Sequence, residues 1–261
     1  MSAAGSLFDV TGKRVVVTGG TRGIGMMIAR GFAEAGARVI ISSRKPDACQ
    51  AAQEELSTVG AVSAFAADLS TPEGIAALAG HVRDTFDAVD VLVNNAGATW
   101  GAPVDEFPRS GFDKILNLNV TSVFEMTQAL LPQLRTAADA AGPARVINIG
   151  SIDGLVVSHT ENFSYGASKA AVHMLTRKLA ATLAAENITV NAIAPGPFPS
   201  KMMAFLLDDP EARAQVEGGV PLGRVGSYED VAGTAIFLSS RAGAYLTGAI
   251  LPVDGGISGT R

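Results

Sequence analysis

The chain has 261 residues, of which 48% are hydrophobic, and its formal net charge is −5. This length suits one α/β domain with a sizeable core, whereas the acidic balance argues against a nucleic-acid partner. The apolar runs are shorter than a membrane span and no signal-peptide pattern opens the chain, so we expect a cytoplasmic protein without a membrane partner. The single cysteine, Cys49, excludes an internal disulfide, and scattered histidines predict no metal site; they are His81, His159 and His173.

Short β-branched runs alternate with amphipathic segments along the chain. The expected strands span residues 15–18, 39–42, 62–66, 89–93, 145–149, 188–193 and 250–253. The expected helices span residues 24–35, 48–56, 75–86, 112–138 and 167–185. This alternation predicts a parallel sheet with helices on both faces. No linker, repeat or low-complexity segment divides the sequence, so we expect one doubly wound α/β domain over residues 1–261.

The residues that directly follow the strands are candidates for a binding site. In doubly wound sheets, ligands bind beyond the carboxyl ends of the strands. Polar or turn-forming residues stand at these positions, namely Thr18, Ser43, Asp68, Asn94, Ser151 and Pro195. We therefore expect these residues to line one edge of the sheet.

A glycine-rich turn follows the first strand and opens a helix. Glycines keep such a turn tight and let the backbone approach a pyrophosphate, which the helix N-terminus favours electrostatically. An ordinary strand–helix turn is the alternative, but the place of this turn in the first βαβ unit favours a dinucleotide site. The predicted contacts in this turn are Gly19, Thr21, Arg22, Gly23, Ile24 and Gly25.

The end of the second strand indicates which dinucleotide is bound. Enzymes that select NAD usually carry an acid here, which bonds the ribose hydroxyls. Ser43 occupies that place and Arg44 follows it. A guanidinium suits the negatively charged 2′-phosphate of NADP, and Arg22 could reach the same phosphate. The alternative is that both arginines are solvated surface charges; we predict NADP(H).

Three motifs in order resemble the short-chain dehydrogenase/reductase family. They are the glycine spacing G-x-x-x-G-x-G, the run Asn94-Asn95-Ala96-Gly97, and Tyr165-x-x-x-Lys169. The resemblance covers residues 12–256 and implies an oxidoreductase with a single Rossmann domain and a seven-stranded parallel sheet. It also implies three further groups of cofactor contacts: two residues at the adenine, three residues after the central strand that support the cofactor, and three residues in a turn beside the nicotinamide. These are Asp68 and Leu69; Asn95, Ala96 and Gly97; and Pro195, Gly196 and Ser200.

Four residues are predicted to be catalytic. Tyr165 and Lys169 share one helix face, and an ammonium should lower the phenol pKa so that Tyr165 exchanges a proton with the substrate oxygen. By resemblance, both residues also contact the cofactor, with Lys169 on the nicotinamide ribose. Ser151 would hold the substrate oxygen, and Asn119 matches the family position that supports a water relay to the lysine. Singly these would be a helix-surface pair, a turn serine and a helix asparagine; their joint occurrence favours catalysis.

The substrate is predicted from a narrower resemblance. The runs Thr99-Trp100-Gly101, Ala144 to Ser151 and Pro197 to Met202 resemble the β-ketoacyl reductase branch, which implies a 3-oxoacyl group on acyl carrier protein or coenzyme A. A mobile lid is expected at about 198–220, and its apolar stretch 202–207 suits an acyl chain, with helix packing or oligomer contact as the alternative. Ser151 and Tyr165 are 14 positions apart, one more than is common in the family, so the loop between them should differ in shape.

Expected partners follow from the same resemblance. An acidic carrier protein would need a basic patch by the active-site mouth, but the matching arginine positions hold Gly142 and Glu186, which argues against such docking. The C-terminal stretch 245–256 resembles the family's interface strand and predicts a homotetramer, with a dimer as the alternative. Two other functions stay open: reduction of a sugar, polyol, steroid or xenobiotic ketone, and a non-catalytic NADP-binding regulatory protein.

Overall fold

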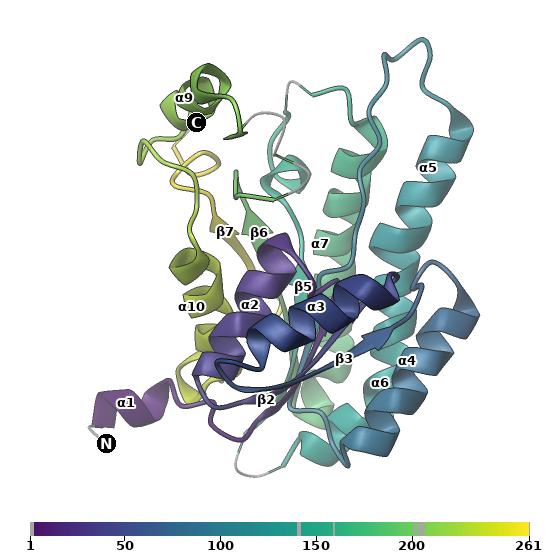
Figure 1. Ribbon diagram of the computed structural model, residues 1–261, viewed down its shortest axis with the longest axis vertical. Helices are drawn as coiled ribbons and strands as arrows, with labels where there is room; N and C mark the ends of the chain where they lie inside the picture. The colour runs from purple at the N-terminus through teal and green to yellow at the C-terminus, as the bar shows by residue number, and fades with distance from the viewer. Residues whose placement is uncertain (1–2, 140–141, 159, 201–202, 204–206, 261) are drawn as a thin grey trace.

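A single parallel sheet organises the chain. The computed structural model describes residues 3–139, 142–158, 160–200, 203 and 207–260. Seven strands pair in the order β3-β2-β1-β4-β5-β6-β7, and every pairing is parallel. Their bounds are β1 Arg14–Thr18, β2 Arg38–Ser43, β3 Ala61–Ala66, β4 Val91–Asn94, β5 Ala144–Ile149, β6 Ile188–Pro195 and β7 Ile250–Val253. The predicted fold class, a doubly wound Rossmann sheet of seven parallel strands, is confirmed (Figure 1).

Helices cover both faces of this sheet. Their bounds are α1 Ala3–Leu7, α2 Gly23–Glu34, α3 Pro46–Leu56, α4 Pro72–Thr85, α5 Arg109–Leu116, α6 Ser122–Ala137, α7 Phe163–Leu183, α9 Pro210–Gly218 and α10 Tyr228–Ser239. One apolar layer joins the sheet to α2, α3 and α10, and a second joins it to α4, α6 and α7. None of the helices in these described segments is long and apolar enough to cross a membrane.

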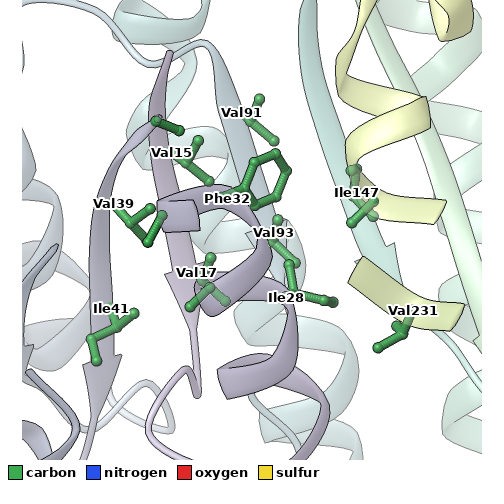
Figure 2. Close-up of a cluster of buried hydrophobic side chains, with 14 of the residues drawn as sticks. Val15, Val17, Ile28, Phe32, Val39, Ile41, Val91, Val93, Ile147 and Val231 are labelled. Atoms are coloured by element: carbon green, nitrogen blue, oxygen red, sulfur yellow. The ribbon is translucent and has the colours of Figure 1, made fainter. Parts of the chain in front are cut away.

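The strands are apolar at nearly every position because both of their faces are buried. Side chains alternate between the faces of a strand, so Val15 and Val17 enter the first layer while Val16 enters the second. In the first layer these valines pack around Phe32 of α2 (Figure 2). The alternating apolar runs of the sequence therefore account for the two-layered core.

The stretch predicted to be helical over residues 112–138 is helical almost throughout, but it contains a π-helical turn that the sequence did not indicate. The structure has α5 and α6 with a π-helical turn between them, η1, at Asn117–Thr121. Single π turns inside helices occur often at functional sites. This one contains Asn119, whose side chain is tied to two other segments rather than to the helix surface. Sequence periodicity cannot detect such a turn, because the apolar spacing changes by only one residue.

Buried amides join the central strands to the helices behind them. Asn94 Nδ2 donates to Asn148 Oδ1 and to Thr127 Oγ1, both at 3.0 Å, which links β4 to β5 and α6. Asn148 Nδ2 donates to Thr176 Oγ1 of α7 at 2.9 Å. Each of these groups is almost fully buried, so the bonds replace those lost to water. The network anchors α7, the helix that carries Tyr165 and Lys169, against the centre of the sheet.

Candidate active site

The glycine turn after β1 is held closed by Asn95 from the end of β4. Asn95 Nδ2 donates to the carbonyl oxygens of Thr18 and Gly19, at 2.9 and 3.0 Å. A Cβ on Gly25 would lie 2.3 Å from the same amide nitrogen, and Gly19 has a φ of +65°. Both glycines are therefore required by close backbone approach and by backbone conformation.

Thr18, which the sequence placed at the binding edge of the sheet without a specific role, belongs to the same junction. Its hydroxyl accepts hydrogen bonds from the backbone nitrogens of Asn95 and Ala96, at 2.9 and 3.0 Å. Gly97 continues this segment toward the π turn, since a Cβ on it would lie 3.2 Å from Asn119 Oδ1.

The N-terminus of α2 fits an anionic diphosphate. Arg22 is the N-cap residue but makes no side-chain cap hydrogen bond, and the first turn contains no acid. Backbone N–H groups of Gly23, Ile24 and Gly25 therefore begin the helix without a side-chain acceptor at the cap, the arrangement that favours phosphate. The residues present thus fit the diphosphate of a dinucleotide.

Two exposed arginines lie beside this helix end. The backbone nitrogen of Gly20 donates to Ser42 O at 3.1 Å, which places the glycine turn against the end of β2. Arg22 belongs to the glycine turn and Arg44 directly follows β2. Neither arginine makes a salt bridge with any residue that the structure describes. Ser43 is the last residue of β2, and its carbonyl accepts a hydrogen bond from Ala67 N at 2.9 Å.

The predicted adenine pair divides into two roles. Asp68 Oδ1 accepts from the backbone nitrogen and the hydroxyl of Ser70, at 3.0 and 2.7 Å. Partial burial raises the pKa of Asp68, but the hydrogen bonds from Ser70 and the charge of Arg44 together lower it by more, so the net shift of the pKa is downward. Leu69 is only 5% exposed and packs in the second core layer. The Leu69 side chain therefore belongs to the hydrophobic core beneath the site.

Tyr165 and Lys169 lie on the first turns of α7. Lys169 is 5% exposed, its ammonium donates to Ile149 O at 2.8 Å, and Nζ lies 5.4 Å from the centroid of the Tyr165 ring. The cation thus sits over the ring face and is held by the last residue of β5. The carbonyl of Ile149 was not foreseen as part of this site.

The predicted lowering of the Tyr165 pKa by Lys169 is wrong for the protein alone. Removal from water raises the pKa of Tyr165 to about 12, and hydrogen bonding with Ser151 only partly opposes this. Burial also lowers the pKa of Lys169 to about 8. The reason is that burial disfavours both charged forms, while the ammonium is engaged by Ile149 rather than by the phenol oxygen. Tyr165 is accordingly a protonated acid at neutral pH.

Ser151 begins the short helical turn η2, Ile152–Gly154, directly after β5. Its hydroxyl accepts from the backbone nitrogen of Asp153 at 3.1 Å, and the residue is 7% exposed. A side-chain hydrogen bond also joins Ser151 to Tyr165, so the structure brings these two predicted residues together although the intervening loop is long. Asp153 itself was not predicted as a site residue.

Asn119 connects the π turn to both sides of the site. Its amide nitrogen donates to Ala98 O at 3.0 Å and to Ser168 Oγ at 2.9 Å, and its oxygen accepts from Ala98 N at 2.9 Å. Ser168 directly precedes Lys169. Asn119 therefore fixes the loop after β4 to the helix that carries the proposed acid and its lysine.

The turn after β6 closes the other side of the site. The nitrogen of Gly196 donates to Val253 O at 3.0 Å, so this turn is held by β7, and Pro195 is buried at the end of its strand. A Cβ on Gly23 would lie 3.3 Å from Ser200 Cβ, which places Ser200 over the glycine turn. Of the predicted lid, α9 and its flanks are described, whereas Met202, Ala204, Phe205 and Leu206 lie outside the described residues, as does His159.

An aromatic cluster, Phe107, Phe112 and Phe163, lies beside the start of α7. Phe107 makes edge contacts with Phe112 and with Phe163, at centroid distances of 5.2 and 5.5 Å. Phe163 is two residues before Tyr165 and remains 42% exposed. The sequence analysis missed this cluster, because it joins one loop residue to residues of two helices that are distant in the chain. It supplies an apolar surface next to the proposed acid.

Comparison with known proteins agrees with this geometry. The family model described as "Enoyl-(Acyl carrier protein) reductase" matches residues 19–258. A rhamnolipids biosynthesis 3-oxoacyl-[acyl-carrier-protein] reductase of Pseudomonas aeruginosa is 48% identical over 95% of this chain and 97% of its own. This chain belongs to the short-chain dehydrogenase/reductase family. Another relative, 3beta-hydroxysteroid dehydrogenase 1 of Eggerthella lenta, is 37% identical over 96% of this chain and 95% of its own.

The fold agrees with that of a solved member of the short-chain dehydrogenase/reductase family. The structure of the Pseudomonas aeruginosa RhlG/NADP active-site complex superposes with a TM-score of 0.95 and 47% sequence identity. The match covers 97% of this chain and 99% of that one. The resemblance to the β-ketoacyl reductase branch is thereby confirmed at the level of family, sequence relative and fold.

For this short-chain dehydrogenase/reductase, the two positions matched to carrier-binding arginines do not flank the proposed site. Gly142 precedes β5 and Glu186 precedes β6, so both lie at the amino ends of strands whose carboxyl ends carry Ser151 and Pro195. Glu186 also pairs with Arg135 at 2.5 Å. The expectation that they stand by the active-site mouth is therefore wrong within one chain, because parallel strands put the two edges at opposite ends.

Proposed function

We propose that this chain reduces a ketone to a secondary alcohol with NADPH, and that its substrate is a 3-oxoacyl thioester. The observation that carries the proposal is the grouping of Ser151, Tyr165 and Lys169 at the sheet edge that also carries a helix end without a side-chain cap and two exposed arginines. The protein is an oxidoreductase by family, and its relative of 48% identity is named as a 3-oxoacyl reductase. A broken set of catalytic positions would be expected of a non-catalytic regulatory protein, and here all four are filled.

The proposed mechanism uses a protonated tyrosine. When bound, NADPH supplies a hydride to the carbonyl carbon. The Ser151 hydroxyl donates a hydrogen bond to the carbonyl oxygen, and Tyr165 gives its proton to that oxygen as charge develops there. The Lys169 ammonium would stabilise the resulting phenolate and would hold the nicotinamide ribose of the bound cofactor. Asn119 keeps the loop after β4 aligned with α7 during this transfer, through its bonds to Ala98 and Ser168.

NADPH is the proposed cofactor because two guanidiniums stand where a 2′-phosphate would be bound. Arg44 follows β2 directly and Arg22 belongs to the glycine turn against it. No acid occupies the end of β2, where selectivity for NAD usually places one. The remaining predicted cofactor residues, including Asp68, Asn95 and Ser200, surround the same edge of the sheet and are proposed as its further contacts.

The acyl chain is assigned to the apolar side of the site. Phe163 and the loop residues Leu155 and Val157 are exposed near the start of α7, with Leu155 40% and Val157 95% accessible. Burying such side chains against an alkyl chain is favourable at about 25 cal/mol per Å². A second candidate substrate is a steroid ketone, since the same surface suits a flat apolar ring system and a relative is named for a hydroxysteroid.

We propose a homotetramer in the cytoplasm. Apolar side chains are exposed on α5, α6 and α7, where a soluble monomer would seldom gather them: Phe112, Leu116, Phe124 and Met174. Tyr245, in the segment matched to the family's interface strand, is fully exposed in the single chain. A dimer through one of these two surfaces is the alternative assembly. The lone cysteine, buried and free, fits a reducing compartment.

The test is the absorbance of NADPH, and separately of NADH, with acetoacetyl-coenzyme A as substrate. We expect rapid loss of NADPH absorbance and slow loss of NADH absorbance. Tyr165→Phe should retain NADPH binding, measured by fluorescence, and lose roughly 10²- to 10⁴-fold in rate. Binding of NADPH without any turnover would contradict the thioester assignment, and a 3-oxosteroid assayed in parallel would decide for the second candidate. Unchanged turnover by Tyr165→Phe would contradict the assignment of the acid.

A further inference from the structure

Asp153 joins the Ser151 turn to the start of α7. Its backbone nitrogen donates to Ser151 Oγ at 3.1 Å, and its carboxylate accepts from Asn162 Nδ2 at 3.1 Å. Asn162 is the N-cap residue of α7, and its carbonyl accepts from the backbone nitrogen of Tyr165 at 2.8 Å. Three hydrogen bonds therefore connect the Ser151 hydroxyl to the Tyr165 backbone across a loop that the sequence alone leaves undefined.

The turn that carries Asp153 also packs directly on α7. A Cβ on Gly154 would lie 2.7 Å from the carbonyl carbon of Lys169, and a Cβ on Gly166 would lie 3.3 Å from Asp153 O. Asp153 is thus in contact with the helix next to Tyr165, and its neighbour Gly154 is in contact with the helix at Lys169. No larger residue fits at Gly154 without separating the turn from the helix.

The carboxylate adds a negative charge at this contact. Burial lowers the pKa of Lys169, and the negative charge of Asp153 raises it by a smaller amount, so Asp153 favours the charged ammonium. Burial raises the pKa of Tyr165 most, the hydrogen bond with Ser151 lowers it, and the charge of Asp153 raises it by a smaller amount. Tyr165 and Lys169 are the titratable groups of α7 that Asp153 influences. His173 of the same helix lies against the neighbouring Gly154, and burial lowers the pKa of His173, so that side chain is neutral near pH 7.

We propose that Asp153 is a positioning residue for the reduction, which sets the Ser151 hydroxyl against the first turn of α7 and places a carboxylate beside the Tyr165–Lys169 pair. The inference rests on the proposed reductase function. It explains how a loop longer than the family norm still delivers Ser151 to the tyrosine. It also supplies the buried ammonium with a nearby negative charge, which a buried cation otherwise lacks.

The charge role is tested with Asp153→Asn, which keeps the size of the side chain, its hydrogen-bonding capacity and the backbone N–H. We expect kcat to fall, with the deficit growing several-fold between about pH 6.5 and about pH 8.5, because Lys169 loses its proton more readily without the carboxylate. KM for NADPH should change little. Asp153→Glu retains the charge and should restore the wild-type pH profile, although its longer side chain should leave kcat below the wild-type value.

The matched control is Glu161→Gln, which removes an exposed carboxylate from the same loop and should leave both rate and profile unchanged. NADPH fluorescence titration of every variant monitors the folded cofactor site. A profile for Asp153→Asn that matches the wild type, whether or not the absolute rate falls, would overturn the proposal. Failure of the reductase assignment would appear instead as lack of turnover by the wild-type protein, so the two failures are distinguishable.

Discussion

At the scale of single residues, the proposed chemistry follows from the burial of one basic group, the Lys169 amine, and one acidic group, the Tyr165 phenol. Lys169 and Tyr165 are both removed from water, so the lysine amine becomes a weaker base and the tyrosine phenol a weaker acid than in solution. Both shifts favour the neutral form of each group. At neutral pH the phenol therefore has a proton to give, which is the state that carbonyl reduction requires.

The buried lysine predicts a rise in stability with pH. The pKa of Lys169, about 8 in the folded chain, lies below its ordinary value of 10.5. Between these values the unfolded chain binds more protons than the folded one, so the free energy of unfolding should increase with pH, by up to about 3 kcal/mol. Above about pH 10 the opposite shift of Tyr165 begins to reverse this gain.

Urea unfolding at about pH 7.5 and about pH 9.5 measures this increase. Lys169→Met should abolish the increase, and it should raise stability most at the lower pH. The control is Lys178→Met, an exposed lysine on the same helix, which should keep the wild-type pH dependence. Equal pH dependence in wild type and Lys169→Met would contradict the assignment.

Arg44 predicts the choice between the two dinucleotides. A charged hydrogen bond to phosphate contributes about 1.5–3 kcal/mol, so Arg44→Ala should raise KM for NADPH roughly 10- to 100-fold and leave KM for NADH nearly unchanged. Initial rates with each cofactor measure the ratio. Arg83→Ala, an exposed arginine in the last turn of α4, is the control and should alter neither KM. A parallel rise for both cofactors would contradict a role in reading the 2′-phosphate.

At the scale of elements, the site depends on how closely α2 approaches β4. Asn95 reaches from the end of β4 to the turn before α2 because Gly19 and Gly25 have no side chains to exclude it. The π turn between α5 and α6 makes a comparable link, since it carries Asn119 to Ala98 and Ser168. In both places an amide from one segment satisfies the backbone or side chain of another, so segments distant in sequence hold the site together.

Gly25→Ala should disrupt the first of these links. Its Cβ would lie 2.3 Å from Asn95 Nδ2 and 2.4 Å from Gly19 O, so the turn must move. Overpacking of this kind lowers the free energy of unfolding by about 1–3 kcal/mol. A loss of binding free energy of about 1.4 kcal/mol corresponds to a tenfold weaker affinity, so NADPH affinity should fall at least about tenfold. Urea unfolding and NADPH fluorescence titration measure the two effects.

The control for this glycine is Gly233→Ala in α10, where an added Cβ meets no atom within 4 Å. That variant should bind NADPH normally and gain about 0.5–1 kcal/mol, because alanine favours the helix. Normal NADPH binding by Gly25→Ala would show that the Asn95 link does not shape the cofactor turn.

At the scale of the whole molecule, the exposed apolar side chains predict association. Phe112, Leu116 and Phe124 lie on α5 and α6, and each is more than a third exposed in the single chain. We expect a molar mass about four times that of one chain by light scattering. Phe124→Asp should lower this mass, because a buried unpaired carboxylate at an interface is unfavourable. Val104→Asp, an equally apolar but loop-borne position, should leave it unchanged.

Much of this architecture could be predicted from local sequence. The strands, the glycine turn and the positions of Ser151, Tyr165 and Lys169 after or near strand ends are recorded in short-range periodicity and spacing. Boundaries moved by a few residues, as where β6 extends to Pro195. The π turn inside the helical stretch over residues 112–138 was not predicted, because such a turn leaves almost no trace in apolar spacing.

By itself, the sequence determined the fold class, the NADP-type cofactor signature and the identity of the candidate acid, because these depend on residue type and order. The tertiary structure alone decided the electrostatic state of Tyr165 and Lys169, which depends on burial. It also decided the link from Ser151 through Asp153 to α7 and the position of Glu186 at the far edge of the sheet. Such properties arise from contacts between segments distant in the chain, and no local pattern of residues encodes them.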